Sequence, residues 1–532
     1  MMPHPHRAGQ GIAGVGPVSD EGMVPWGPSC GCKPRLEILG SLSCADPVGD
    51  GDVVVSPKPR VAEQWSGSIT DDMDTAGGPP SVDDGGGGSG VAAWLPWILL
   101  GALGVITVGV LVLNAGDDEA APETTTTAAP TTTQATTTTV ADTTTTSEGP
   151  TSPPGEALKL SSLMPLAGAL GNFGGSMQNA IQLAVDEANA AGGVNDAQVE
   201  HLARDTQTDP SIAQDAAAEV IAAGTQGMVG AAGSDQSLAI LDLVTGSPVM
   251  MLSPSNTSPQ FSVVDDPDNF YGRTTPSDSL QALVLSALID GKGVTSIDLI
   301  FRADSYGEGL SGALAEDFVA TYGGTVGETI SYATDQTNFD AEITQLAGSD
   351  SEAIVCICFT GEGLTIFRNA LAEGLLEKPW FGGDGIWLPS FAADVFPDDP
   401  TILTGVLEGT APAPGDGPAF AAFASSYNAA YGGDPGPFAA NSYDAAWLLI
   451  LAAEASDGTP AGIKSVVFDI SRPPGTPCGP LECLELIRTG QDIDYVGATG
   501  DINFDDIGDV ITPYLLWKIN DDGVGEAYDT VQ

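Results

Sequence analysis

The chain has 532 residues, and 71 Asp and Glu against 16 Lys and Arg give a formal net charge of −55 at pH 7. A surface this acidic repels nucleic acid and anionic lipid headgroups, so nucleic-acid binding and polybasic membrane binding are excluded. Only three histidines are present, and only His201 lies in a segment with regular apolar periodicity. We therefore expect no histidine-based zinc site, no Ser–His–Asp triad and no cofactor, and we expect His201 to be structural.

Composition divides the chain into four parts. Residues 1–90 are rich in Gly, Pro, Ser and Asp, a composition typical of disorder. Residues 91–113 form an uncharged apolar run that, at about 1.5 Å per residue, is long enough to cross a hydrocarbon core of roughly 30 Å. Residues 114–155, rich in Thr and Pro, are typical of an extended stalk. Regular periodicity occupies 156–532, which is predicted to be the folded ligand-binding domain.

The orientation of the predicted transmembrane helix follows from its flanking charges. Five Lys and Arg residues precede the run, and none lies between it and Lys159. The excess of positive charge places residues 1–90 in the cytoplasm and the large domain outside the cell. The sequence thus predicts a single-pass protein of the cell membrane, attached through its N-terminal helix, with an extracytoplasmic C-terminal domain.

Four cysteines lie in the folded region. Cys478 and Cys483 flank a short turn that begins Gly-Pro, and an oxidising exterior favours a disulfide between them. Cys356 and Cys358 are two residues apart in an apolar run predicted to be a strand. The Cα separation of such a pair approaches the upper limit for a disulfide, so both thiols are expected to be free.

From residue 156 onward, short apolar runs alternate with amphipathic stretches of helical length, which predicts parallel α/β sheets. The expected strands span residues 158–165, 199–204, 227–230, 249–252, 296–301, 325–332 and 353–358. The expected helices span residues 174–191, 210–223, 237–245, 280–288, 310–322, 341–346 and 364–373. Two successive runs of this pattern predict two lobes. Ligands bind beyond the carboxyl ends of the strands in such sheets, so the strand-to-helix loops should carry the site.

Four of these loops are polar. Residues 233–237 and 253–259 of the first lobe offer hydroxyls and free N–H groups near helix starts, which suit a carboxylate. Residues 304–309 and 382–385 of the second lobe offer acidic and aromatic groups. Any one such loop is also explained as a turn or a helix cap. Because four of them fall at equivalent strand ends, they predict a site for a zwitterion.

Two other segments resemble ligand-binding motifs but lack residues that those motifs require. Gly230 and Gly233 lack the third glycine and the later acidic residue of a dinucleotide-binding fingerprint. The Asp-rich residues 501–509 lack the spacing and the terminal Glu of a calcium loop, so no metal is predicted there.

The polar loops resemble those of the leucine/isoleucine/valine-binding proteins of ABC importers. The matching segments are Met-Pro-Leu-Ala-Gly at 164–168, Ala-Asn-Ala-Ala-Gly-Gly at 188–193, Leu-Ser-Pro-Ser-Asn-Thr-Ser-Pro at 252–259 and Asp-Ser-Tyr-Gly-Glu-Gly at 304–309. The resemblance covers about residues 158–520. It implies a two-lobed type 1 periplasmic-binding fold, a hinge between the lobes, an amino-acid ligand and ABC permease subunits as partners.

The resemblance also implies roles for residues that match the family's site. Ser234, the Ser255 backbone and Thr257 would hold the α-carboxylate of the ligand. Asp384, where the family often has Glu, would pair with the α-ammonium, and Tyr306 would close over the ligand from the second lobe.

Two aromatic residues complete the implied site. Phe359 falls where the family often has Tyr, and it would either hold the ammonium on its ring face or bound the side-chain pocket. Phe173 would line that pocket. The predicted tether replaces the signal peptide or lipid anchor that is usual in the family.

Four functions are compatible with at least part of these observations. A binding protein that delivers an amino acid or a similar polar solute to an ABC importer fits best. A sensor that signals through the single membrane span uses the same domain, but the cytoplasmic tail lacks a kinase or cyclase pattern. An exported enzyme lacks a general base and metal ligands, and an adhesive wall protein is suggested by the stalk alone. The chain is therefore predicted not to be an enzyme.

Overall fold

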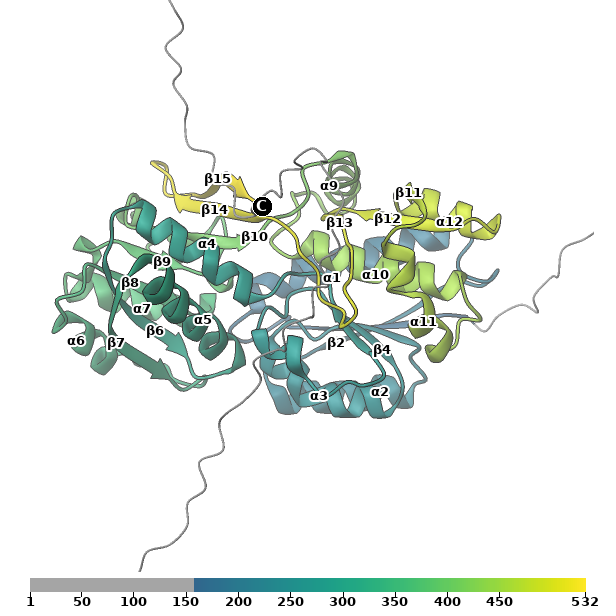
Figure 1. The fold of residues 1–532 in the computed structure, drawn as a ribbon, viewed down its shortest axis with the longest axis horizontal. Helices are drawn as coiled ribbons and strands as arrows, with labels where there is room; N and C mark the ends of the chain where they lie inside the picture. The colour runs from purple at the N-terminus through teal and green to yellow at the C-terminus, as the bar shows by residue number, and fades with distance from the viewer. Residues whose placement is uncertain (1–156) are drawn as a thin grey trace, which may run out of the picture. The chain divides into compact units, whose positions relative to one another are not determined.

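The computed structural model describes residues 157–532 (Figure 1). The predictions for residues 1–155, including the transmembrane helix at 91–113 and the stalk at 114–155, lie outside the described residues. Within 157–532, no helix combines the length and the apolar composition needed to cross a membrane.

The first lobe is built on a parallel sheet of five strands in the order β2-β1-β3-β4-β5. Its strands are β1 (Lys159–Met164), β2 (Glu200–Asp205), β3 (Gly227–Gly230), β4 (Met250–Ser253) and β5 (Tyr271–Arg273). Its main helices are α1 (Gly171–Ala190), α2 (Pro210–Ala222), α3 (Ser234–Gly246) and α10 (Ala439–Glu454). Helices α1 and α10 pack on each other, as do α2 and α3.

Both faces of this sheet are buried, because neighbouring residues of each strand enter different cores. Leu163 and Met228 pack in the cluster formed with α2 and α3. Met164 and Val229, the next residue in each strand, pack in the cluster formed with α1 and α10. Burial on both faces explains why the central strands β3 (Gly-Met-Val-Gly) and β4 (Met-Met-Leu-Ser) show no alternation of apolar and polar residues.

The second lobe contains a seven-stranded sheet in the order β15-β14-β10-β9-β8-β6-β7, parallel from β10 to β7 and antiparallel at β14 and β15. Its strands are β6 (Ser296–Arg302), β7 (Thr325–Tyr332), β8 (Ala353–Ile357), β9 (Trp380–Gly382), β10 (Leu407–Pro412), β14 (Tyr514–Ile519) and β15 (Gly525–Val531). Its helices are α4 (Asp278–Gly291), α5 (Ser305–Tyr322), α6 (Asp340–Ala347), α7 (Thr360–Ala372) and α8 (Phe391–Val395).

The chain passes between the lobes three times, through residues 274–277, 413–417 and 502–513. After β10 it returns to the first lobe and adds α10 and four smaller elements, and it then re-enters the second lobe at β14. The additions are α9 (Pro418–Tyr431), α11 (Pro460–Val466), α12 (Pro480–Arg488) and the small sheet β11 (Thr476–Cys478), β12 (Ile493–Gly497) and β13 (Gly500–Asp501). The prediction of two α/β lobes joined by a hinge is therefore confirmed.

Several helices begin about one turn earlier than the apolar pattern predicts. Helix α3 begins at Ser234 rather than at 237, α5 at Ser305 rather than at 310, and α7 at Thr360 rather than at 364. The first turns are polar, so the 3.6-residue apolar periodicity is not visible there. Two of the four polar loops of the predicted site, 233–237 and 304–309, are therefore helix N-termini.

The cysteine predictions have mixed outcomes. Cys478 and Cys483 are disulfide-bonded as expected, with Cα atoms 5.2 Å apart. The expectation that Cys356 and Cys358 are free is wrong, because they too are bonded, with Cα atoms 5.7 Å apart. Strand β8 ends at Ile357, so the chain turns before Cys358 and this distance falls below the roughly 6.6 Å of an extended pair.

His201 lies in β2 and bridges polar side chains of the first lobe. Its Nε2 is 2.9 Å from Ser162 Oγ, and its Nδ1 is 2.8 Å from Gln182 Oε1. Burial lowers the pKa of His201 to about 4, so the ring is neutral at pH 7. These contacts agree with the predicted structural role.

Candidate functional site

A small cavity lies where the carboxyl ends of the strands of both lobes meet. Pro165 follows β1, Ser234 follows β3 and Ser255 follows β4, while Phe359 follows β8 and Asp384 follows β9. The strand order reverses at β1 in the first sheet, where β1 lies between β2 and β3, and at β6 in the second, where β6 lies between β7 and β8. Open α/β sheets bind ligands at such switch points. The free space amounts to about 20 Å³.

Six of the seven predicted ligand-binding residues line this cavity: Phe173, Ser234, Ser255, Tyr306, Phe359 and Asp384. Thr257 is buried but does not lie on the cavity wall. Asp278 and Phe438 adjoin the site as well, and sequence reasoning missed both.

The two hydroxyl-bearing loops of the first lobe are tied to each other. Ser253 Oγ donates to the Ala231 carbonyl at 2.8 Å, and Ser255 Oγ donates to the Ala232 carbonyl at 2.9 Å. Ser234 is the first residue of α3, where the N–H groups of the first turn have no partner within the helix. The free N–H groups and the partial positive charge of this helix end favour an anion.

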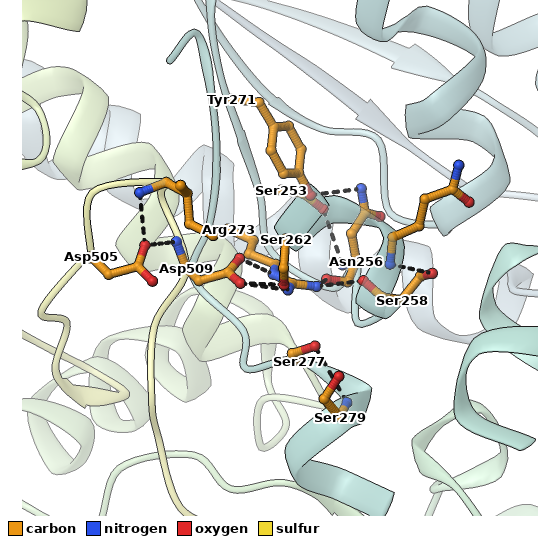
Figure 2. Close-up of polar contacts among 12 residues, drawn as sticks. Ser253, Asn256, Ser258, Ser262, Tyr271, Arg273, Ser277, Ser279, Asp505 and Asp509 are labelled. Carbon is orange, nitrogen blue, oxygen red and sulfur yellow. Dashed lines mark hydrogen bonds and ion pairs between the residues drawn. The ribbon is translucent and has the colours of Figure 1, made fainter. Parts of the chain in front are cut away.

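Buried Arg273 anchors the loop that carries Ser255 (Figure 2). Its Nη1 donates to the carbonyls of Asn256, at 3.1 Å, and Ser258, at 2.8 Å. Asp509 pairs with the same guanidinium through two bonds, at 2.6 Å to Nε and 2.9 Å to Nη2 (Figure 2). Because Asp509 belongs to the linking segment 502–513, the ion pair joins the candidate ligand loop to the hinge.

Aspartates of the Asp-rich segment 501–509 thus make contacts that hold the fold together. Asp505 accepts the N–H groups of Ile507 and Asp509, each at 2.9 Å, and so caps a tight turn. Within residues 157–532, no group of three or more Cys, His, Asp or Glu side chains is placed to hold a metal ion.

Tyr306 and Asp384 form the polar wall of the second lobe. The Tyr306 hydroxyl donates to Asp384 Oδ1 at 3.0 Å and accepts from the Gly385 amide at 3.1 Å. Only glycine fits at 385, because a Cβ atom there would lie 2.6 Å from the Cys358 carbonyl oxygen. Burial raises the pKa of Asp384 to about 6, and the hydrogen bond from Tyr306 partly opposes the shift.

Asp278 is a second buried carboxyl group close to Asp384. Burial is the largest cause that raises the pKa of Asp278 well above its ordinary value, and the charge of Asp384 adds to it. The nearby Thr257 hydroxyl lowers the pKa of Asp278. Within the described residues, however, the Thr257 hydroxyl and both carboxyl oxygens of Asp278 lack a well-formed hydrogen bond. Two adjacent buried carboxyl groups with unused acceptor capacity favour a cation.

Asp278 was missed because Ser-Asp-Ser at 277–279 is typical of a helix start. The Ser277 side chain does cap α4, by accepting the amide of Ser279 at 3.3 Å (Figure 2). Asp278, the residue after Ser277, is fully buried by distant parts of the chain, and no local sequence pattern reveals such burial.

The ring face of Phe359 already contacts a cationic side chain. The Arg302 guanidinium carbon lies 4.0 Å from the ring centroid, and the Tyr306 ring stacks on Phe359 with centroids 5.2 Å apart. Asp304, at 2.8 Å, and Glu362 both pair with Arg302. Of the two roles expected for Phe359, bounding the side-chain pocket therefore fits this geometry better than holding a ligand ammonium.

The lobes touch on both sides of the cavity. Asp235 accepts the Ser305 amide at 2.9 Å, and Ser258 Oγ donates to the Ser305 carbonyl at 2.8 Å. On the other side, the Gly361 amide donates to the Ala169 carbonyl at 3.2 Å. A cavity of 20 Å³ holds little more than one water molecule. Entry of an amino acid therefore requires the lobes to separate and these contacts to break.

Comparison with known proteins agrees with this geometry. The family model described as "Periplasmic binding protein" matches residues 157–522. The chemotactic signal transduction system substrate-binding protein BasB of Halobacterium salinarum is 27% identical over 70% of this chain and 89% of its own length. Leu/Ile/Val-binding protein homolog 2 of Brucella abortus is 25% identical over 68% of this chain and 90% of its own length.

A solved structure shares the fold. The branched-chain amino acid transporter substrate-binding protein LivJ of Streptococcus pneumoniae, in complex with isoleucine, aligns with a TM-score of 0.59 at 23% identity. The alignment covers 70% of this chain and 99% of LivJ. The family model covers well over half of the chain, and the two-lobed type 1 architecture agrees with it. The chain therefore belongs to the periplasmic binding protein family, whose members bind ligands rather than catalyse reactions.

Proposed function

We propose that this protein is an extracytoplasmic substrate-binding protein that captures an amino acid between its lobes and delivers it to the permease subunits of an ABC importer. The cavity between the lobes carries the proposal, because it combines an anion-binding helix end with buried carboxyl groups. This pairing of opposite charges suits a zwitterion better than a sugar or a simple acid.

The carboxylate of the ligand would be held by the first lobe. Ser234, the first residue of α3, lines the cavity from one loop, and Ser255 lines it from the next. The Ser234 hydroxyl, the free amides of the first turn of α3 and the Ser255 backbone would donate to the carboxylate. The Thr257 hydroxyl, which lacks a well-formed bond within the described residues, is a further donor near this position. Several donors from a rigid loop hold an anion without needing a cationic side chain.

The ammonium would be held by Asp384, with Asp278 close by. Both carboxyl groups are buried, and each is disfavoured in its charged form until a cation arrives. The ligand ammonium would relieve this cost, and Tyr306 would keep Asp384 oriented through its hydroxyl. The binding energy thus comes partly from neutralising a charge that the empty protein holds at a cost.

An apolar wall would receive the side chain of the ligand. Leu170, Phe173, Met177, Phe359 and Phe438 line the same cavity, and none of them carries a charge. The size and character of this wall suit an aliphatic side chain. The Brucella relative is named as a Leu/Ile/Val-binding protein homolog and the LivJ structure holds isoleucine, which supports a branched-chain amino acid.

A thermal-shift screen of the full-length protein against amino acids, amides, sugars and small acids tests this proposal. Leucine, isoleucine or valine should raise the unfolding temperature, because a ligand that binds only the folded state stabilises it. Stabilisation by sugars or simple acids alone would contradict a zwitterion site.

A sensory function is the second candidate, and the Halobacterium salinarum relative BasB supports it because BasB is named for a chemotactic signal transduction system. The same site would then report the presence of a ligand rather than feed a permease. Deleting the gene separates the two: loss of labelled leucine uptake supports transport, whereas intact uptake with lost attraction toward leucine supports sensing.

Anchoring through residues 91–113 and the stalk at 114–155 remains part of the proposal. Protease added to intact cells should cut in the stalk and release the acidic domain, while residues 1–90 stay protected. Protection of the large domain instead would reverse the proposed orientation.

A further inference from the structure

The disulfide between Cys356 and Cys358 directly precedes a residue of the ligand cavity in the chain. Cys356 belongs to strand β8, and Cys358 is followed by Phe359, which lines the cavity. Both cysteines are buried, and neither lines the cavity itself. The bond can therefore affect a ligand only through the residues that it positions.

Closure of so short a loop contributes little to the stability of the whole fold. In the chain-entropy model, a disulfide stabilises a protein more when it closes a longer loop. Cys356 and Cys358 are two residues apart, whereas Cys478 and Cys483 are five residues apart. The main effect of the Cys356–Cys358 bond is therefore expected on the local backbone.

The bond fixes the place where β8 leaves the sheet. Cys356 is held in register with Ile300 of β6 and with Gly382 of β9. Residues two apart in an extended strand have Cα atoms roughly 6.6 Å apart, whereas those of Cys356 and Cys358 are 5.7 Å apart. The chain is therefore bent between the two cysteines, and β8 ends at Ile357.

The bent segment packs against the loop that carries Asp384. A Cβ atom at Gly385 would lie 2.6 Å from the Cys358 carbonyl oxygen, so the two backbones are in close contact. The Gly385 amide also donates to the Tyr306 hydroxyl at 3.1 Å. A shift of the Cys358 carbonyl would therefore displace the loop that carries Asp384.

Phe359 connects the same segment to the cavity wall. Its ring lines the cavity and stacks on the ring of Tyr306, with centroids 5.2 Å apart and an angle of 18° between the ring planes. The Tyr306 hydroxyl in turn donates to Asp384 at 3.0 Å. A series of contacts thus leads from the disulfide to the carboxyl group that is proposed to pair with the ligand ammonium.

We propose that the Cys356–Cys358 disulfide is a positioning element of the ligand site, which holds Phe359 against Tyr306. Without the bond, β8 is free to continue beyond Ile357, and Phe359 then leaves the strand in a different direction. The protein must order these side chains when the ligand binds, at a cost in affinity. The inference rests on the proposed function for the choice of an amino acid as the ligand.

Calorimetric titration of leucine into full-length Cys356→Ala/Cys358→Ala tests the inference. Ordering one side chain on binding lowers the affinity by about two- to twelvefold, so the loss of order at both rings should weaken leucine binding by about tenfold or more. Cys478→Ala/Cys483→Ala is the matched control, because this pair is also buried and bonded but does not precede a residue of the cavity. Its leucine affinity should equal that of the unmodified protein.

Reduction gives a second measurement that needs no substitution at residues 356 and 358. The Cys478→Ala/Cys483→Ala protein is unfolded in urea with a phosphine and refolded with it, because the remaining bond is buried in the folded state. The disulfide takes up two electrons and two protons to give two thiols, and the phosphine is oxidised to its oxide with the oxygen of water. Leucine affinity should fall by the same factor on reduction and return on reoxidation.

The Cys356→Ala/Cys358→Ala protein, taken through the same steps, should bind leucine equally well with and without the phosphine. This control accounts for any effect of the phosphine on Cys30, Cys32 and Cys44. Leucine affinity that changes less than about twofold in both the double variant and the reduced protein overturns this inference alone. An equal loss in the two double variants also overturns it, because the effect would then be a general one of losing a disulfide. If the unmodified protein binds no amino acid, the proposed function is wrong and the inference is wrong with it.

Discussion

The Tyr306 hydroxyl donates a hydrogen bond to Asp384 at 3.0 Å, and both side chains come from the second lobe and face the first. Asp384 is thus held in place before any ligand arrives. Its carboxyl group is buried, and a buried carboxylate is costly unless a cation or further donors reach it. The proposed ligand ammonium is such a cation.

Ligand affinity should fall below pH 6. Burial raises the pKa of Asp384 to about 6, so in more acidic solution the empty site is mostly protonated and a bound ammonium must displace that proton. The leucine ammonium stays charged throughout. Linkage then predicts that affinity decreases about tenfold between pH 7.5 and pH 5. Calorimetry at both pH values measures this change, and equal affinities would show that Asp384 does not pair with the ligand.

Asp278→Asn should make the empty protein more stable, and increasingly so as pH rises. The pKa of Asp278 is raised in the folded protein, so on raising the pH above about 3.8 the unfolded chain loses this proton first and unfolding becomes more favourable. The asparagine variant lacks this penalty. Its gain in unfolding temperature should be small at pH 5 and larger at pH 8, at about 1 °C per kcal/mol for a folded region of this size.

Asp290→Asn, at the exposed end of the same helix, is the control for this change. Its stability should follow the pH dependence of the unmodified protein. If the unfolding temperatures of the Asp278 variant and the unmodified protein differ by the same amount at all pH values, burial does not raise the pKa of Asp278.

Asp235→Ala should weaken ligand binding without changing the site. Asp235, in the first lobe, accepts the Ser305 amide of the second lobe, so this bond requires the lobes to be in contact, as the proposed capture between the lobes does. Losing one such bond should reduce the apparent affinity about 10- to 150-fold, because hydrogen bonds to charged groups contribute about 1.5–3 kcal/mol. Asp242→Ala, exposed on the same helix, should have no effect. Equal affinities of the two variants would exclude a role for this contact in closure.

Asp509→Ala should destabilise the protein strongly. It leaves the fully buried Arg273 without its counter-charge, and breaking a buried ion pair costs about 3–5 kcal/mol. Asp469→Ala removes the exposed partner of Arg472 and should cost less than about 1 kcal/mol. Urea unfolding of both variants gives the comparison. Similar losses for the two would mean that the hinge pair contributes no more than a surface pair.

Local patterns predicted most of the fold and most of the residues that line the cavity between the lobes. Strands β3 and β7 lie at the predicted residues, and Ser234, Ser255 and Asp384 meet because each follows a parallel strand. The carboxyl ends of such strands share one edge, so strand position alone brings these residues together.

The features that were missed depend on contacts between distant parts of the chain. Arg273 and Asp509 are 236 residues apart in sequence, and neither stands out from its surroundings. Phe438 follows Pro-Gly-Pro, which is typical of a loop, and its place on the wall of the cavity depends on how the two lobes pack. The pairing of Cys356 with Cys358 depended on where β8 ends, and strand ends are the least certain part of any pattern.

The most direct test of the account is calorimetric titration of leucine into the full-length protein and into Asp384→Ala. Truncating one partner of a buried charge pair costs roughly 2–5 kcal/mol, so the variant should lose about 30- to several-thousand-fold in affinity. The empty protein should be no less stable than before, because burial disfavours the charged form of Asp384. Asp416→Ala, exposed on the linking segment 413–417, should bind as tightly as the unmodified protein. Equal leucine affinity in Asp384→Ala and the unmodified protein would contradict a zwitterion site built on Asp384.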